Sequence, residues 1–135
     1  MTISERLGNN IINYVLRSEV PEKINKIFVS LHTADPGATG KNEITAEQWP
    51  SYTRIDVSTN GDQQGFSRAV SKTASNNLKI LWPPLDGQSH VIASHFGLWD
   101  GEHNFLYGGA FTAPKKIYPK DQCIIFADQL VFTLE

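Results

Sequence analysis

The chain lacks the features that mark exported, membrane-bound and nucleic-acid-binding proteins. Its 135 residues include one cysteine, Cys123, which cannot form an internal disulfide and is typical of a reducing compartment. It has no run of about 18 apolar residues and no signal-peptide pattern, so we expect a soluble protein that is not exported by that route and has no membrane partner. A net charge of −2 provides no basic field, so we expect no nucleic-acid partner.

Nucleotide-binding and catalytic motifs are also missing. There is no Walker loop or G-x-G-x-x-G to hold a phosphate. His32 and Asp35 have the residue types of a base and its orienter, but no G-x-S-x-G elbow supplies a serine nucleophile. Cys123 lies beside the apolar residues 124–126, which predicts a buried side chain and not a nucleophile. We therefore predict no catalytic residue, no cofactor and no enzymatic activity.

Four residues of types that bind metals cluster near one turn of the sequence. They are His95, Asp100, Glu102 and His103. Their spacing contains no tight ligand pair of the kind that structural zinc sites use. We therefore predict no metal site and interpret these four as ordinary turn and core residues.

The stretch from Ser89 to Phe111 predicts a central β-hairpin. Residues 91–99 are apolar on both alternating faces, which is typical of a strand in the middle of a covered sheet. Asp100-Gly101 is a turn dipeptide, because glycine accepts a positive φ and aspartate tolerates it. Residues 105–111 return as the second strand, in which Gly108 and Gly109 leave room for a large neighbour or mark a bulge.

Residues 1–18 predict an amphipathic helix. Thr2-Ile3-Ser4-Glu5 matches the capping box, and Pro21 requires the helix to end near Ser18. One apolar stripe follows from the helical spacing of Leu7, Ile11, Tyr14 and Val15. Such a helix either covers an end or edge of the sheet or docks on another protein, and we expect the first.

The rest of the chain predicts short strands. We expect strands at 26–33, 52–58, 66–70, 77–82 and 122–135, the last bent near Ala127-Asp128, and a long irregular connection at 38–50. Turn signals every 8 to 12 residues or so favour a sandwich over any βαβ arrangement. The predicted fold is all-β, an antiparallel β-sandwich of the jelly-roll or Ig-like kind with one N-terminal α-helix. Residues 1–135 form a single domain, with the helix at 1–18 and the strands at 27–135.

Two groups of surface candidates remain. Lys115, Lys116 and Lys120 predict a solvated basic turn at 114–121, because only Tyr118 is present to stack on a base. Trp49, Tyr52 and Trp82 stand beside proline or loop residues, so their burial in one small domain is not assured, and a core position is equally open for Trp82. Exposed aromatic residues are enriched at interfaces, so these three are the predicted partner interface.

The order of several segments carries a resemblance. They are LHTADPGATGKNE at 31–43, YTR at 52–54, ASHFGLWD at 93–100, FLYGGAFTAPKKIYPKDQ at 105–122 and LVFTL at 130–134. Together they resemble a family of short tailed-bacteriophage virion proteins, often labelled tail-fibre or minor structural proteins. Residues 47–50 depart from it, since the family tends to have small residues before its Tyr-Arg. The resemblance implies a structural subunit of the virion, without catalytic residues.

The expected function follows from that resemblance. We expect a homo-oligomer on the particle, assembled in the host cytoplasm and bound to other virion proteins through a free sheet edge and the loop 34–50. One placement is a tail or fibre component, and the alternative is a capsid decoration (cement) protein. A different class is a carbohydrate-binding module for a host surface glycan, with Trp49, Tyr52 or Trp82 as the sugar platform. A hydrolase is the remaining alternative.

Overall fold

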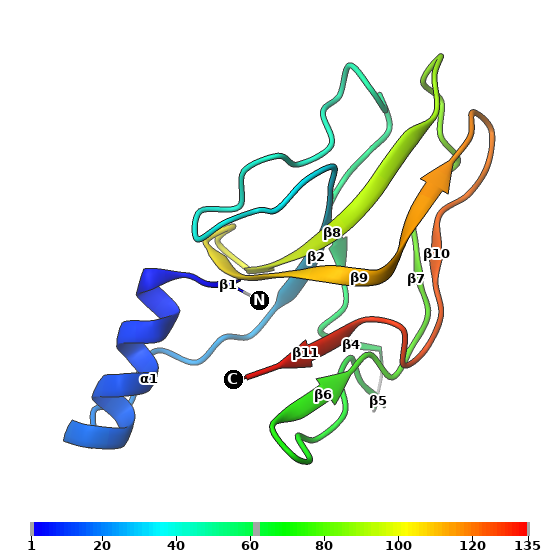
Figure 1. Ribbon diagram of the computed structural model, residues 1–135. Helices are drawn as coiled ribbons and strands as arrows, with labels where there is room; N and C mark the ends of the chain where they lie inside the picture. The colour runs from blue at the N-terminus through cyan, green and yellow to red at the C-terminus, as the bar shows by residue number, and fades with distance from the viewer. Residues whose placement is uncertain (1, 61–62, 135) are drawn as a thin grey trace.

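The computed structural model describes residues 2–60 and 63–134, and it is an all-β sandwich with one helix near the N-terminus (Figure 1). The larger layer is an antiparallel sheet with the strand order β1-β9-β8-β2-β3. Its strands are β1 (Thr2–Ile3), β2 (Ile27–His32), β3 (Ile55–Asp56), β8 (Val91–Asp100) and β9 (Phe105–Ile117). The two edge strands have two residues each, which limits edge-to-edge pairing with another sheet.

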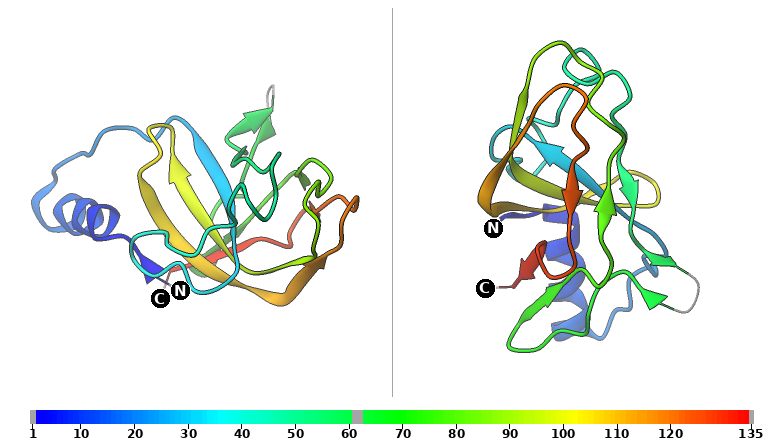
Figure 2. Two further views of the ribbon diagram at one scale, coloured as in Figure 1. Left: turned by 90° about the horizontal axis from the view of Figure 1, so that it is seen from above. Right: turned by 90° about the vertical axis from the view of Figure 1, so that its right-hand side faces the viewer.

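Three antiparallel pairs of short strands complete the sandwich. They are β6 (Thr73–Ser75) with β11 (Val131–Thr133), β7 (Ile80–Leu81) with β10 (Ile124–Ile125), and β4 (Thr59–Asn60) with β5 (Gln63–Gln64). In Figure 2 the pairs β6–β11 and β7–β10 lie together on one side of the main sheet. The hydrophobic core lies between the main sheet and these pairs. In it Leu31 and Phe96 of the main sheet belong to the same buried cluster as Ile80, Ile125 and Leu130.

The predicted central hairpin is confirmed, with differences at its turn. β8 and β9 pair directly, with Trp99 opposite Phe105 and Gly97 opposite Gly108. The positive φ that was expected at Gly101 falls on His103, with φ 62°. Asp100 stabilises the turn because its carboxylate accepts hydrogen bonds from the backbone N–H groups of residues 102 and 104.

Close packing explains the paired glycines of β9. A Cβ atom at Gly108 would lie 2.9 Å from a side-chain carbon of Pro36. One at Gly109 would lie 2.8 Å from the ring of Phe96. Both positions leave room for a large neighbour, as the sequence predicts. β9 continues through Pro114 to Ile117, so the expected basic turn begins four residues later than predicted.

The other expected strands are shorter than predicted. The segment 52–58 contains only β3, and 77–82 contains only β7. Residues 66–70 contribute isolated bridges, from Phe66 to Asn76 and from Val70 to Thr73. The segment 122–134 is bent as expected, with Asp128 at φ 68° between β10 and β11, and Glu135 lies outside the described residues.

Candidate assembly surface

The helix α1 (Glu5–Arg17) ends where predicted, but it begins later than the predicted range 1–18 and has a different cap. Ser4 is the N-cap, and its Oγ accepts a hydrogen bond from the backbone N–H of Leu7 at 3.1 Å. Thr2, the cap that the capping-box pattern predicts, instead lies in β1 and pairs with Gly108 of β9. At the other end Ser18 adopts the left-handed conformation and ends the helix where Pro21 required it to end.

The expectation that α1 covers the sheet is wrong for most of its length. Its first turn packs against the core through Leu7, but none of its thirteen residues, all of them described by the structure, is buried. Figures 1 and 2 show α1 standing to one side of the sheets, joined to them by β1 and by the segment 18–26. The large apolar side chains exposed on α1 and this segment are Ile11, Ile12, Tyr14, Val15, Leu16, Val20 and Ile24.

The exposed apolar side chains leave α1 with little stabilisation from packing, and its composition adds little helix propensity. Gly8, Asn9, Asn10 and Asn13 are poor helix formers, and a helix of 13 residues is marginal in water on its own. Full burial of a leucine, isoleucine or valine side chain contributes about 1.5–3 kcal/mol. A partner that covered α1 would therefore stabilise both the helix and the complex.

The apolar residues of α1 divide into two sides. Successive residues of a helix are about 100° apart around its axis. Viewed down the axis, the apolar side chains therefore span an arc of about 200° that begins at Tyr14 and ends at Leu16, with Gly8 and Glu5 as its non-apolar positions. One side is a ridge, which we define as Ile12, Val15 and Leu16, with exposed fractions of 55%, 68% and 77%. A surface helix that packs against one body needs an arc of only about 100°.

The other side of the helix borders an apolar groove. The groove lies between α1 and the segment 18–26 and has a volume of about 300 Å³. Its apolar lining is Leu7, Ile11, Tyr14, Pro21 and Ile24, and Asn10 and Glu22 complete it. The ridge and the groove thus lie on the two sides of one short helix.

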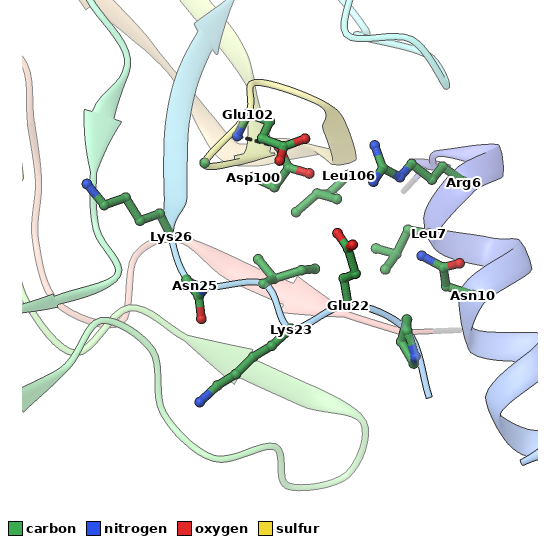
Figure 3. A pocket seen from close by; sticks show the side chains of 13 residues that line it. Arg6, Leu7, Asn10, Glu22, Lys23, Asn25, Lys26, Asp100, Glu102 and Leu106 are labelled. Atoms are coloured by element: carbon green, nitrogen blue, oxygen red, sulfur yellow. Dashed lines mark hydrogen bonds between the residues drawn. The ribbon is translucent and has the colours of Figure 1, made fainter. Parts of the chain in front are cut away.

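An adjoining hollow between α1 and the sheet is charged, and it shares Leu7, Asn10, Pro21, Glu22 and Ile24 with the groove. Figure 3 shows it between α1, the segment 21–26 and the β8–β9 turn, and its volume is about 410 Å³. Its charged side chains are Arg6, Glu22, Lys23, Lys26, Asp100 and Glu102, three of each sign. Burial raises the pKa of Asp100, but hydrogen bonds from Asn104 and Glu102 outweigh it and hold the pKa below its usual value. The balance of charge and the role of Asp100 in the turn favour a structural hollow over a ligand site.

The predicted interface residues do not form a surface. Trp49 and Trp82 are both 0% exposed, and the Trp82 Nε1–H donates to the backbone oxygen of Thr53 at 3.0 Å. The expected exposure of Trp49 is therefore wrong, and Trp82 takes the core position that was left open for it, so neither indole offers a sugar or a protein a stacking face. Ile44 and Trp49 of the connection 38–50 contribute to the core, so this loop is less free for contacts than its composition suggested.

Tyr52 holds that connection in place. Its hydroxyl donates to Glu43 at 2.8 Å and accepts from the backbone N–H of Leu31 at 2.9 Å. Glu43 also forms a bidentate ion pair with Arg54, at 2.9 and 3.1 Å. The Arg54 guanidinium lies 3.5 Å above the ring of Trp99, so this network ties the loop to the central hairpin.

A serine and a histidine meet inside the main sheet. Ser30 and His32 are both 0% exposed, and the Ser30 Oγ lies 2.6 Å from the His32 Nε2. The His32 Nδ1–H donates to the backbone oxygen of Lys41 at 2.7 Å, so Nε2 of the neutral ring accepts a hydrogen bond from the Ser30 hydroxyl. Trp99 donates to Ser30 at 2.7 Å, and burial lowers the pKa of His32, which favours the neutral ring.

This pair has the components of a nucleophile and its base, but its position is structural. Asp35, the expected orienter, instead accepts a hydrogen bond from the backbone N–H of Gly37. The space above the pair is closed, because a Cβ at Gly97 would lie 2.5 Å from the Ser30 Oγ. The arrangement therefore satisfies three buried polar groups inside the core and leaves a substrate no access to them.

Three of the four metal-type residues lie in the β8–β9 turn, and His95 lies apart from them within β8. His95 is hydrogen-bonded to Ser94 at 2.7 Å, and His103 accepts from Arg54 at 3.0 Å. Asp100 is occupied by the turn. Within residues 2–60 and 63–134, no three His, Cys, Asp or Glu side chains converge as a metal site. Cys123 is buried as predicted, and burial raises the pKa of its thiol to about 11.

Comparison with known families decides the class of the protein. The family model described as podophage GP4 fiber I protein gp80 matches residues 2–133. The chain belongs to this family. The fibre family confirms the resemblance to virion proteins of tailed bacteriophages and implies a structural role in the virion. A comparison with curated proteins finds no match.

Both the fibre family and the geometry indicate that the function of the protein depends on its surfaces. A fibre protein associates with other virion proteins, so its function depends on its surfaces. No helix among the described residues is long and apolar enough to cross a membrane. The sequence already contained the signal for the helix surface, because Ile12 and Leu16 widen the apolar stripe well beyond the residues that one sheet would cover.

Proposed function

We propose that the chain is a non-enzymatic subunit of the phage tail, attached to the tail or its fibres as one folded domain and assembled in the host cytoplasm. The match to the fibre family over residues 2–133 is the observation that carries this proposal. The exposed apolar surface of α1 supports it, since a subunit of a larger assembly needs such a contact surface. The single buried thiol is compatible with assembly in a reducing compartment.

The copy number of the chain in purified virions tests this placement. Quantitative mass spectrometry against the major capsid protein is the measurement. A tail component is expected in a small number of copies set by the rotational symmetry of the tail. A count comparable with the capsid protein would contradict the tail placement and favour capsid decoration. Absence from the particle would contradict any role as a virion subunit.

Labelling the particle gives an independent readout. Antibodies raised against the purified chain are expected to bind at the tail vertex in electron micrographs of negatively stained virions. Label spread over the head would contradict the proposal even if the copy number were low.

A further inference from the structure

The two sides of α1 complement each other in shape and chemistry. The ridge of Ile12, Val15 and Leu16 projects from one side, and the apolar groove opens on the other. We propose that the ridge of one copy of this chain packs into the groove of a second copy, so that copies join head to tail. The inference names the partner for the surface of the proposed tail subunit and rests on that proposal for the expectation of repeated copies.

The width of the apolar arc favours a second copy over a single different partner. A partner that covered only the ridge would leave Tyr14 and Ile24 exposed, at 57% and 43%, and one that covered only the groove would leave Leu16 exposed. Identical copies remove both exposures at once, because every copy supplies one ridge and one groove. A heterologous contact of this kind closes into a ring when its rotation permits, which matches the symmetry of a tail.

The dimensions of the two sides agree. A cavity of about 150 Å³ holds a group as large as benzene, so a groove of about 300 Å³ accommodates two aliphatic side chains of the ridge. The ridge itself carries no charge. Among the described residues that line the groove, Glu22 is the only charged one.

The mass of the purified full chain in solution tests the proposal. Size-exclusion chromatography with light scattering is expected to give the mass of at least three chains for the wild type, since a head-to-tail ring needs that many. Leu16→Glu on the ridge and Tyr14→Glu in the groove are each expected to reduce the mass to one chain. Both positions are exposed, so circular dichroism is expected to show an unchanged fold.

A matched control uses an exposed apolar residue away from α1. Val70 is 74% exposed, and Val70→Glu is expected to leave the oligomer intact. If Val70→Glu also gave a monomer, the effect would not be specific to α1 and the proposal would be overturned. The same holds if Leu16→Glu kept the wild-type mass.

Mixing the two variants tests the head-to-tail arrangement. The Tyr14→Glu chain keeps its ridge and the Leu16→Glu chain keeps its groove, so an equimolar mixture is expected to form dimers and no larger species. A mixture that stayed monomeric would overturn the ridge-to-groove contact. A wild-type chain that is monomeric up to high concentration would also overturn it, whereas a small fixed copy number in virions would then leave the proposed function standing.

Discussion

The central hairpin β8–β9 and the helix α1 are the two most clearly patterned parts of the chain, and they have opposite fates. Phe96 and Leu98 of the hairpin are nearly completely buried between the layers of the sandwich. Val15 and Leu16 of the helix are mostly exposed. Apolar periodicity therefore identifies a face that needs covering, and only the surrounding structure shows whether the same chain covers it.

The largest expected effects contrast one leucine in each environment. Leu31 is 0% exposed in β2, so Leu31→Ala is expected to lower the free energy of unfolding by about 2–5 kcal/mol, through lost burial and the cavity left behind. Leu16 is 77% exposed, and Leu16→Ala is expected to change it by no more than about 0.5 kcal/mol in the monomer. Urea unfolding at a concentration where the chain is monomeric measures both. Equal effects would contradict the assigned burial.

The core of the main sheet is also expected to reject added volume. Gly97→Ala places a Cβ 2.5 Å from the Ser30 Oγ and 2.8 Å from the His32 Nε2, where both atoms are buried and hydrogen-bonded. Overpacking of this kind costs about 1–3 kcal/mol. Gly101→Ala is the matched control, because its Cβ would meet only the Lys26 side chain at 3.3 Å or more. Thermal unfolding of the two variants distinguishes them, and a stable Gly97→Ala protein would contradict the closed core.

The helix end gives a smaller and more local effect. Ser4→Ala removes the hydrogen bond from the Leu7 N–H to the Ser4 Oγ and is expected to destabilise α1 by about 1 kcal/mol. Faster amide hydrogen exchange in residues 5–17, with unchanged exchange in β8, is the expected readout. Thr2→Ala is the control, since Thr2 is not the cap. A larger effect for Thr2→Ala would restore the capping-box interpretation.

The smallest effect that we expect concerns a single proton. Burial lowers the pKa of His32 in the folded state, so the unfolded chain binds the proton more readily. Stability is therefore expected to fall as the pH drops below about 6.5, the ordinary histidine value, and to be fully present above it. Urea unfolding midpoints between pH 8 and pH 5 measure this for the wild type and for His32→Gln. The variant is expected to lose part of the pH dependence, and an unchanged profile would contradict the assignment.

Several features of the fold and site follow from local pattern. The helical spacing and Pro21 bound α1 at Ser18, and the alternation from Val91 to Trp99 identifies β8. The apolar neighbours of Cys123 predict its burial. The cap at Ser4 was missed because Thr2 satisfies the same motif, and the pairing of Thr2 with β9 is a contact between residues far apart in the sequence.

The sequence alone determined the fold class, the helix, the central hairpin and the phage family, because these depend on periodicity, turn residues and the order of motifs. Only the tertiary structure decided that Trp49 and Trp82 lie in the core, that Tyr52 joins a polar network, and that α1 stands clear of the sheet. Burial depends on contacts between distant residues, and local pattern carries no record of them. The amphipathic helix was visible in the sequence, but its uncovered apolar surface required the structure.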